Sequence, residues 1–112
     1  MKRKSMFYAA LLVFALAIAG SFTAARAADA ETVEVRIDNF AFTPQTLMVP
    51  VNTTVTWVNH DDVPHSVVSN DGVFKSKALD TDDKYSYTFT KTGTYAYFCG
   101  VHPHMTGKIV VQ

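Results

Sequence analysis

Several residue types and patterns are scarce or absent in this sequence. Its 112 residues include one cysteine, Cys99, so the chain cannot form the internal disulfides on which small secreted domains usually rely. There is no basic cluster, no glycine-rich loop that could cradle a phosphate and no carboxylate pair of catalytic character. Internal repeats, low-complexity tracts and interdomain linkers are also absent. The sequence therefore predicts one small domain and gives no support for nucleotide or nucleic-acid binding.

The first 27 residues predict a secretory signal peptide. Residues 2–4 are Lys-Arg-Lys, residues 6–20 are apolar, and residues 25–27 (Ala-Arg-Ala) have the form of a cleavage site. We expect cleavage after Ala27 and export to the periplasm, with residues 28–30 as a second possible site. A retained membrane anchor is the alternative, because the uncharged stretch approaches the ~20 residues that a span requires. Small and polar residues in its second half favour removal.

Residues 28–112 form the predicted mature domain. Four of the ten basic side chains lie in the predicted signal peptide, so six basic and ten acidic side chains remain, a net charge of minus four. A mildly acidic protein is not expected to bind nucleic acid. A chain of this length buries only about 60–65% of its unfolded surface, so its core alone gives limited stability.

Alternation of apolar and polar residues with a period of two predicts β-strands along the mature domain. It occurs at residues 32–37, 54–57 and 85–90, where β-branched and aromatic residues alternate with polar ones. Turn-forming residues lie at 43–44, 50–52, 70–72 and 92–93, and no convincing helical pattern follows residue 27. The predicted fold class is all-β, because many short strands pack most naturally as a β-sandwich.

Residues 99–107 carry three different metal-binding side chains within seven positions, Cys99, His102 and Met105. A thiolate, an imidazole and a thioether together select copper, and the thioether in particular argues against zinc. Glycine and proline interrupt any helix in this segment, and strand-forming residues flank it, so we expect a turn between two strands. Each side chain alone could be an ordinary core or surface residue. Their combination predicts a metal site.

A histidine nitrogen is expected as the fourth ligand, and three histidines are available. His104 is disfavoured because it lies too close to His102, with a stiff proline between them. His60 lies among asparagine and aspartates in a segment typical of a solvated turn. His65 is favoured, because Pro64 fixes the backbone before it and a short apolar strand follows it.

Three segments together resemble the cupredoxins, the small blue copper proteins: residues 54–59 (TVTWVN), 64–68 (PHSVV) and 93–111 (GTYAYFCGVHPHMTGKIVV). The similarity covers nearly all of the chain after residue 30. The two-residue gaps on both sides of His102 are most similar to those of the amicyanins, whereas plastocyanins and azurins have longer ligand loops. The resemblance implies a Greek-key β-sandwich and a type 1 copper site with His65, Cys99, His102 and an axial Met105 as ligands.

One position departs from the family pattern. Many cupredoxins have asparagine directly after the first histidine ligand, where its side chain helps to join the two ligand loops, and here the residue is Ser66. A serine side chain reaches less far, so the sequence leaves open whether this link is kept. A metal that joined His65 to the Cys99 segment would cross-link the chain in place of a disulfide.

These features predict a soluble, exported, monomeric one-electron carrier with a single Cu(I)/Cu(II) ion, with no membrane association after signal cleavage. An enzyme is not expected, because a copper oxidase or nitrite reductase needs a second metal and usually another domain. The resemblance implies transient redox partner proteins and, by analogy with amicyanins, a dehydrogenase donor and a cytochrome c acceptor. One alternative is a periplasmic copper carrier, with Met48, His60 and His104 as further ligand candidates. The other alternative is a β-sandwich domain that binds a partner without a metal.

The alternation also predicts where aromatic residues lie. Phe98 is expected near the surface beside the inward-facing Cys99, and Trp57 and either Phe40 or Phe42 are expected in the core. Residues 80–84, which are mostly charged, are predicted to form a solvated turn. Apolar residues of the two predicted ligand segments are expected to form a small docking patch, with the members Pro64, Val101, Pro103 and Met105.

Overall fold

The computed structural model describes residues 31–112, which form eight β-strands and no helix. The all-β prediction is therefore confirmed. The predicted signal peptide, residues 1–27, and its cleavage point lie outside the described residues. Within residues 31–112, no helix is long and apolar enough to cross a membrane. The strands are β1 (Thr32–Asp38), β2 (Ala41–Thr43), β3 (Thr46–Val49), β4 (Thr53–Asn59), β5 (Val68–Ser69), β6 (Lys84–Phe89), β7 (Gly93–Phe98) and β8 (Thr106–Val111).

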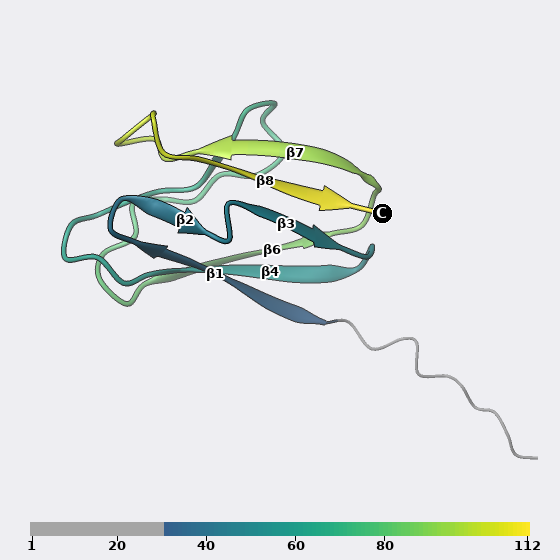
Figure 1. Ribbon diagram of the computed structural model, residues 1–112, viewed down its shortest axis with the longest axis horizontal. Coiled ribbons are helices and arrows are strands. Elements are labelled where there is room, and N and C mark those ends of the chain that lie inside the picture. The colour runs from purple at the N-terminus through teal and green to yellow at the C-terminus, as the bar shows by residue number, and fades with distance from the viewer. Residues whose placement is uncertain (1–30) are drawn as a thin grey trace, which may run out of the picture.

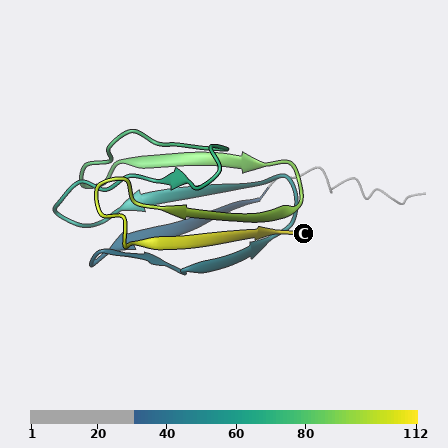
Figure 2. The same cartoon turned by 90° about the horizontal axis from the view of Figure 1, so that it is seen from above.

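The strands form two four-stranded sheets, with the orders β2-β1-β4-β6 and β3-β8-β7-β5. Figure 1 shows β7 and β8 in one layer and β4 and β6 in the other, and Figure 2 shows that the strands share one long direction. Each sheet contains one parallel pair, β1 with β4 and β3 with β8, and its other pairs are antiparallel. This is the Greek-key β-sandwich that the resemblance implies.

The alternating pattern of the sequence decides which side chains form the core. Val35 and Ile37 of β1 are fully buried, whereas the intervening Arg36 is exposed. An aromatic cluster fills the space between the sheets, with the ring of Trp57 centred 5.5 Å from that of Phe74 and 5.4 Å from that of Tyr97. Burial of such large apolar side chains is the main source of stability in a domain of this size.

Phe40 and Phe42 have different environments. Phe42 in β2 is 3% exposed and belongs to the core, as predicted for one of the two residues. Phe40 is 48% exposed and lies in the two-residue turn between β1 and β2, so it is not a core residue. Alternation alone could not separate them, because residues two positions apart are expected on the same face of a strand. The turn at Asn39 and Phe40 breaks this alternation, and the sequence pattern did not show it.

The predicted ligand residues lie at one end of the sandwich. The connection between β7 and β8 contains Cys99, His102 and Met105, and Figure 1 places it at the end opposite the C-terminus. The connection between β4 and β5, which contains His65, supplies the other segment of the site. The two sheets therefore hold together two segments that are distant in sequence.

Candidate metal centre

The segment between β7 and β8 is a compact turn closed by its own backbone. The N–H of Cys99 donates to the carbonyl of Met105 at 3.0 Å, and the N–H of Met105 donates to the carbonyl of His102 at 2.9 Å. Cys99 is fully buried and Met105 is 7% exposed, whereas His102 is partly exposed. The predicted turn between two strands is confirmed, and its hydrogen bonds bring the three side chains together.

His65 is held in the interior by a short β-bridge. Its N–H donates to the carbonyl of Leu79 at 3.1 Å, and the N–H of Leu79 donates to the carbonyl of His65 at 2.7 Å. The side chain of His65 is fully buried. A histidine in this position has its backbone fixed from two sides, as a rigid ligand requires.

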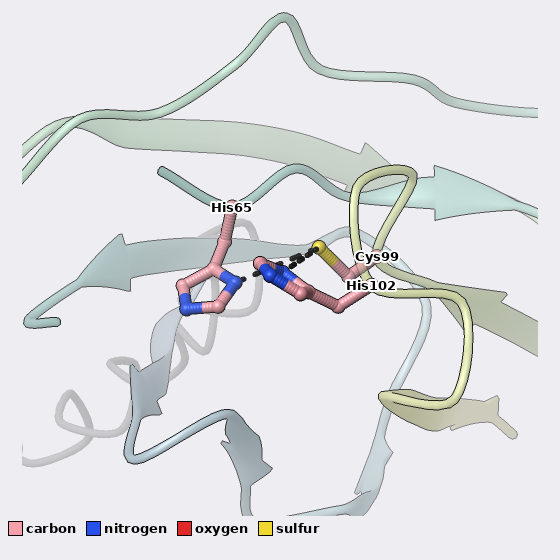
Figure 3. Close-up of side chains that lie close together, drawn as sticks. All are labelled: His65, Cys99 and His102. Atoms are coloured by element: carbon pink, nitrogen blue, oxygen red, sulfur yellow. Dashed lines mark hydrogen bonds between the residues drawn. The ribbon is translucent and has the colours of Figure 1, made fainter. Parts of the chain in front are cut away.

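The rings of His65 and His102 both point at the sulfur of Cys99 (Figure 3). Cys99 Sγ lies 3.6 Å from Nδ1 of His65 and 3.9 Å from Nδ1 of His102. Donor atoms of these three residues all lie within 4.8 Å of one another, and no other group of three or more His, Cys, Asp or Glu residues in positions 31–112 meets this condition. The sequence-predicted residues are thus brought together, with Met105 joined to the same turn by its backbone.

Asp61 fixes the orientation of the buried histidine. Its Oδ2 atom lies 2.8 Å from Nε2 of His65. Burial opposes ionisation of Asp61, but hydrogen bonds from the N–H groups of Phe40 and Asn39 and from His65 outweigh it and lower the pKa of the carboxyl to about 2. An ionised carboxylate only accepts hydrogen bonds, so Nε2 of His65 carries the proton and Nδ1 keeps its lone pair for a metal.

Sequence reasoning missed the role of Asp61 by treating the surrounding segment as a solvated turn. The side chain of Asp61 is only 13% exposed. The available signal was a carboxylate four residues before a histidine already favoured as a ligand, in a connection between strands. A carboxylate partner for a metal-binding histidine is a common arrangement.

Ser66 provides the link that the sequence left open. The N–H of Gly100 donates to Oγ of Ser66 at 2.8 Å, and the N–H of Ser66 donates to Sγ of Cys99 at 3.3 Å. Serine therefore joins the two ligand-bearing segments despite its short reach.

The other two histidines lie outside the cluster, as predicted. His104 is exposed, and Nε2 of His60 lies 3.6 Å from Oε2 of Glu34 on the neighbouring strand. Phe98 is partly buried and lies near the surface, as predicted, where it borders a surface hollow with Asn70, Pro103 and Thr106. Phe98, which directly precedes Cys99 in the chain, therefore reaches solvent on one side.

The donor set fits copper on chemical grounds. One sulfur and two Nδ1 atoms converge where Cys99 and His65 are buried and His102 is partly exposed, Asp61 fixes the tautomer of one imidazole, and a thioether residue closes the turn. Soft sulfur and borderline nitrogen ligands in a nearly trigonal set, with methionine as a weak further donor, are the arrangement of blue copper sites. These residues are arranged as a copper site.

Comparisons with known proteins give the same result. Residues 9–111 match the family model of the cupredoxin-like domain. The chain is 40% identical over 96 residues to amicyanin of Paracoccus denitrificans, covering 81% of this chain and 72% of that protein. It is 36% identical over 118 residues to amicyanin-alpha of Methylorubrum extorquens, covering 98% and 99% of the two chains.

Solved structures agree with the sequence relatives. Amicyanin of Paracoccus versutus superimposes with a TM-score of 0.69 at 32% identity, covering 75% of this chain and 84% of that one. A purple cupredoxin of Nitrosopumilus maritimus gives a TM-score of 0.68 at 34% identity, covering 71% and 99%. With the fold, the copper-site arrangement and these relatives in agreement, the chain belongs to the cupredoxin family, as a blue copper protein close to the amicyanins.

Proposed function

We propose that this protein is an exported one-electron carrier that binds one copper ion through His65, Cys99, His102 and Met105, with Met105 in the axial position. The observation that carries the proposal is the convergence of one sulfur and two imidazole nitrogens within 4.8 Å at one end of a rigid sandwich. Copper held in such a set supplies one-electron exchange between Cu(I) and Cu(II). Membership of a family of electron carriers supports this function.

The surrounding residues would keep the donor atoms still during electron exchange. Asp61 holds the ring of His65, Ser66 joins the two ligand segments, and the backbone bond between Cys99 and Met105 closes the turn. None of these contacts depends on the charge of the metal. Both oxidation states would therefore share nearly one geometry, which keeps the reorganisation energy of electron transfer small.

His102 is the proposed point of contact with redox partners. It is partly exposed and lies in an apolar surface that we call the docking face, lined by Phe40, Val101, His102, Pro103, His104 and Met105. A small apolar surface without strongly charged side chains suits brief encounters rather than stable complexes. We propose that the monomer exchanges electrons here with transient partner proteins, a dehydrogenase as donor and a cytochrome c as acceptor.

We also propose that residues 1–27 are removed after export and that residues 28–112 function in the periplasm. The basic start, the apolar run and the A-x-A sequence at residues 25–27 support this proposal. Intact-mass spectrometry of protein recovered from periplasmic and membrane fractions tests it. We expect an N-terminus at Ala28, and an intact N-terminus in the membrane fraction would contradict the proposal.

Titration of the metal-free protein with Cu(II), followed by visible spectroscopy, tests the site. We expect one equivalent to produce an intense blue charge-transfer band from the Cys99 thiolate. The band should be lost in Cys99→Ser and kept in His104→Ala, a matched histidine control outside the cluster. A parent protein that stays colourless, or a Cys99→Ser variant that keeps the band, would overturn the ligand assignment.

Repeated reduction and oxidation distinguishes electron transfer from copper handling. An electron carrier keeps its metal in both oxidation states, so the blue band should return fully after each cycle in the presence of a moderate Cu(I) chelator. Loss of copper to the chelator on reduction would instead favour the copper-carrier alternative.

A further inference from the structure

Phe40 is a large aromatic residue in a backbone position that seldom accepts one. Asn39 and Phe40 form the two-residue turn between β1 and β2, with φ angles of +53° and +57°. Hairpin turns of this kind need two left-handed residues and strongly favour glycine at the second position. Burial does not explain the phenylalanine, because the side chain is 48% exposed. A strained residue of this kind points to a functional constraint.

Asp61 holds this strained turn in place. Its Oδ1 atom accepts the N–H of Asn39 at 2.7 Å, and its Oδ2 atom accepts the N–H of Phe40 at 2.9 Å. Asp61 is fixed in turn, because its own N–H donates to Oδ1 of Asn59 at 2.9 Å and its carbonyl accepts the hydroxyl of Thr81 at 2.6 Å. The same carboxylate that orients His65 therefore also sets the backbone of Phe40.

The ring of Phe40 covers both histidines. It stacks on His102 with ring centroids 5.0 Å apart and an angle of 25° between the planes. It meets His65 edge-on, with centroids 5.3 Å apart and an angle of 79°. His65 has Asp61 and full burial to fix its ring, whereas His102 is partly exposed on a surface turn. The face of Phe40 thus supports the more exposed of the two imidazoles.

We propose that Phe40 is a positioning residue that keeps the imidazole of His102 directed at the metal. The inference rests on the proposed copper site. The Asp61 carboxylate fixes the turn, the turn places the phenyl ring, and the ring blocks rotation of His102 towards solvent. Ligand release would have to break this stack, so Phe40 slows the loss of copper.

Three substitutions separate the ring from the backbone strain. Phe40→Gly removes the ring and relieves the left-handed strain, Phe40→Leu keeps apolar bulk without an aromatic face, and Phe40→Tyr keeps the ring. Val73→Ala is the control, because Val73 is an exposed apolar residue, 40% exposed, that lies outside the docking face. Unfolding of each metal-free variant shows whether the fold is intact, and Phe40→Gly is expected to be at least as stable as the parent.

The rate of copper transfer from the reduced protein to a chromophoric Cu(I) chelator is the main measurement. Since an aromatic pair contributes modestly to the energy, we expect about twofold to tenfold faster release from Phe40→Gly and Phe40→Leu, and rates near the parent for Phe40→Tyr and Val73→Ala. Proton NMR of the metal-free protein provides a second readout. We expect contacts between the ring protons of residue 40 and His102 in the parent and Phe40→Tyr.

The outcomes distinguish this inference from the proposed function. If the parent binds copper and turns blue but Phe40→Gly and Phe40→Leu release it at the parental rate, the positioning role is wrong and the copper site stands. Release from Phe40→Tyr as fast as from Phe40→Leu would also overturn it, because the aromatic face would then be irrelevant. A parent that binds no copper removes both proposals.

Discussion

At the scale of single residues, the contact between Ser66 and Gly100 depends on both residues being small. A Cβ atom on Gly100 would lie 2.8 Å from Oγ of Ser66, closer than real Cβ atoms approach their neighbours. Glycine therefore brings its backbone near enough for a serine hydroxyl to accept the N–H of residue 100 at 2.8 Å. The short reach of serine is compensated by the close approach of the opposite segment.

Ser66→Ala should destabilise the metal-free protein by about 1 kcal/mol, because a part-buried hydrogen bond from the N–H of Gly100 is lost. Urea unfolding of the metal-free protein measures the difference. Ser86→Ala is the matched control, since Ser86 pairs with Thr56 on an exposed face, and we expect a change within about 0.5 kcal/mol. Equal changes in the free energy of unfolding for the two substitutions would show that the contact between Ser66 and Gly100 stabilises the protein no more than an exposed serine contact does.

Asp61 predicts a loss of stability in acid. The pKa of Asp61 is lowered from 3.8 to about 2 in the folded protein. The ionised carboxylate therefore stabilises the fold fully above about pH 4, and this stabilisation is lost as the pH falls to 2. The size of the effect is at most about 2 kcal/mol. Urea unfolding of the metal-free protein between pH 5 and pH 2 should show a steeper decline for the parent than for Asp61→Asn. Parallel curves would contradict the assignment.

The four proposed ligands could be predicted because their chemistry is visible in short stretches of sequence. Three occur within residues 99–105, and the fourth follows a proline and precedes a short strand. The contact between Asp61 and His65 spans only four positions and had a local signal, but the contribution of Phe40 could not be predicted in this way. It depends on the turn after β1 meeting the connection after β4, a contact between residues 21 positions apart that no local pattern encodes.

At the scale of elements, the pairing of β7 with β8 depends on a close contact between Tyr97 and Gly107. The two residues lie opposite each other in the antiparallel register, and Tyr97 is 1% exposed. A Cβ atom on Gly107 would overlap the Cζ and hydroxyl atoms of the Tyr97 ring. The ring is enclosed by the core and cannot move aside freely, so glycine is required at this point of β8.

Gly107→Ala should destabilise the protein by about 1–3 kcal/mol, as overpacking in a close-packed core does. Tyr97→Phe alone should cost little, because the Tyr97 hydroxyl has no hydrogen-bond partner within residues 31–112. The double variant should recover part of the loss, since one of the overlapping atoms is gone. Thermal unfolding of the three variants measures this coupling, and strictly additive effects would argue against the contact.

The strands themselves were largely predictable, but their pairing was not. Alternation located β1, β4 and β6, because more buried and less buried residues alternate along β1, β6 and the first part of β4. The parallel pairings of β1 with β4 and β3 with β8 join strands far apart in sequence, and no local pattern of residues specifies them. β2 and β3 belong to different sheets, and the sequence did not predict this change. With only three and four residues, the two strands are too short to show a clear alternating pattern.

At the scale of the whole molecule, the site joins parts of the chain that follow strands in different sheets. His65 follows β4 of one sheet, and Cys99 directly follows β7 of the other. The two residues are 34 positions apart. A metal bound to both closes a long loop between the layers, which restricts the unfolded chain as a disulfide would.

Copper should therefore raise the thermal stability of the whole sandwich. At a free copper concentration about 1,000 times the dissociation constant, the free energy of unfolding should rise by about 4 kcal/mol. Differential scanning calorimetry of the parent with and without copper measures it, and a chelator should reverse it. Cys99→Ser should show little of the increase. An equal increase in that variant would indicate that copper stabilises the protein elsewhere.

β8 carries the chain from the ligand segment to the far end of the sandwich. It starts directly after Met105, and the C-terminus lies at the end opposite the connection between β7 and β8 (Figure 1). The six residues of β8 span about 20 Å. A linker attached at Gln112 would therefore fix the protein to an electrode or bead with Phe40 and His102 facing the solution. Immobilised in this orientation, the molecule would stay open to every partner that reaches it from the bulk.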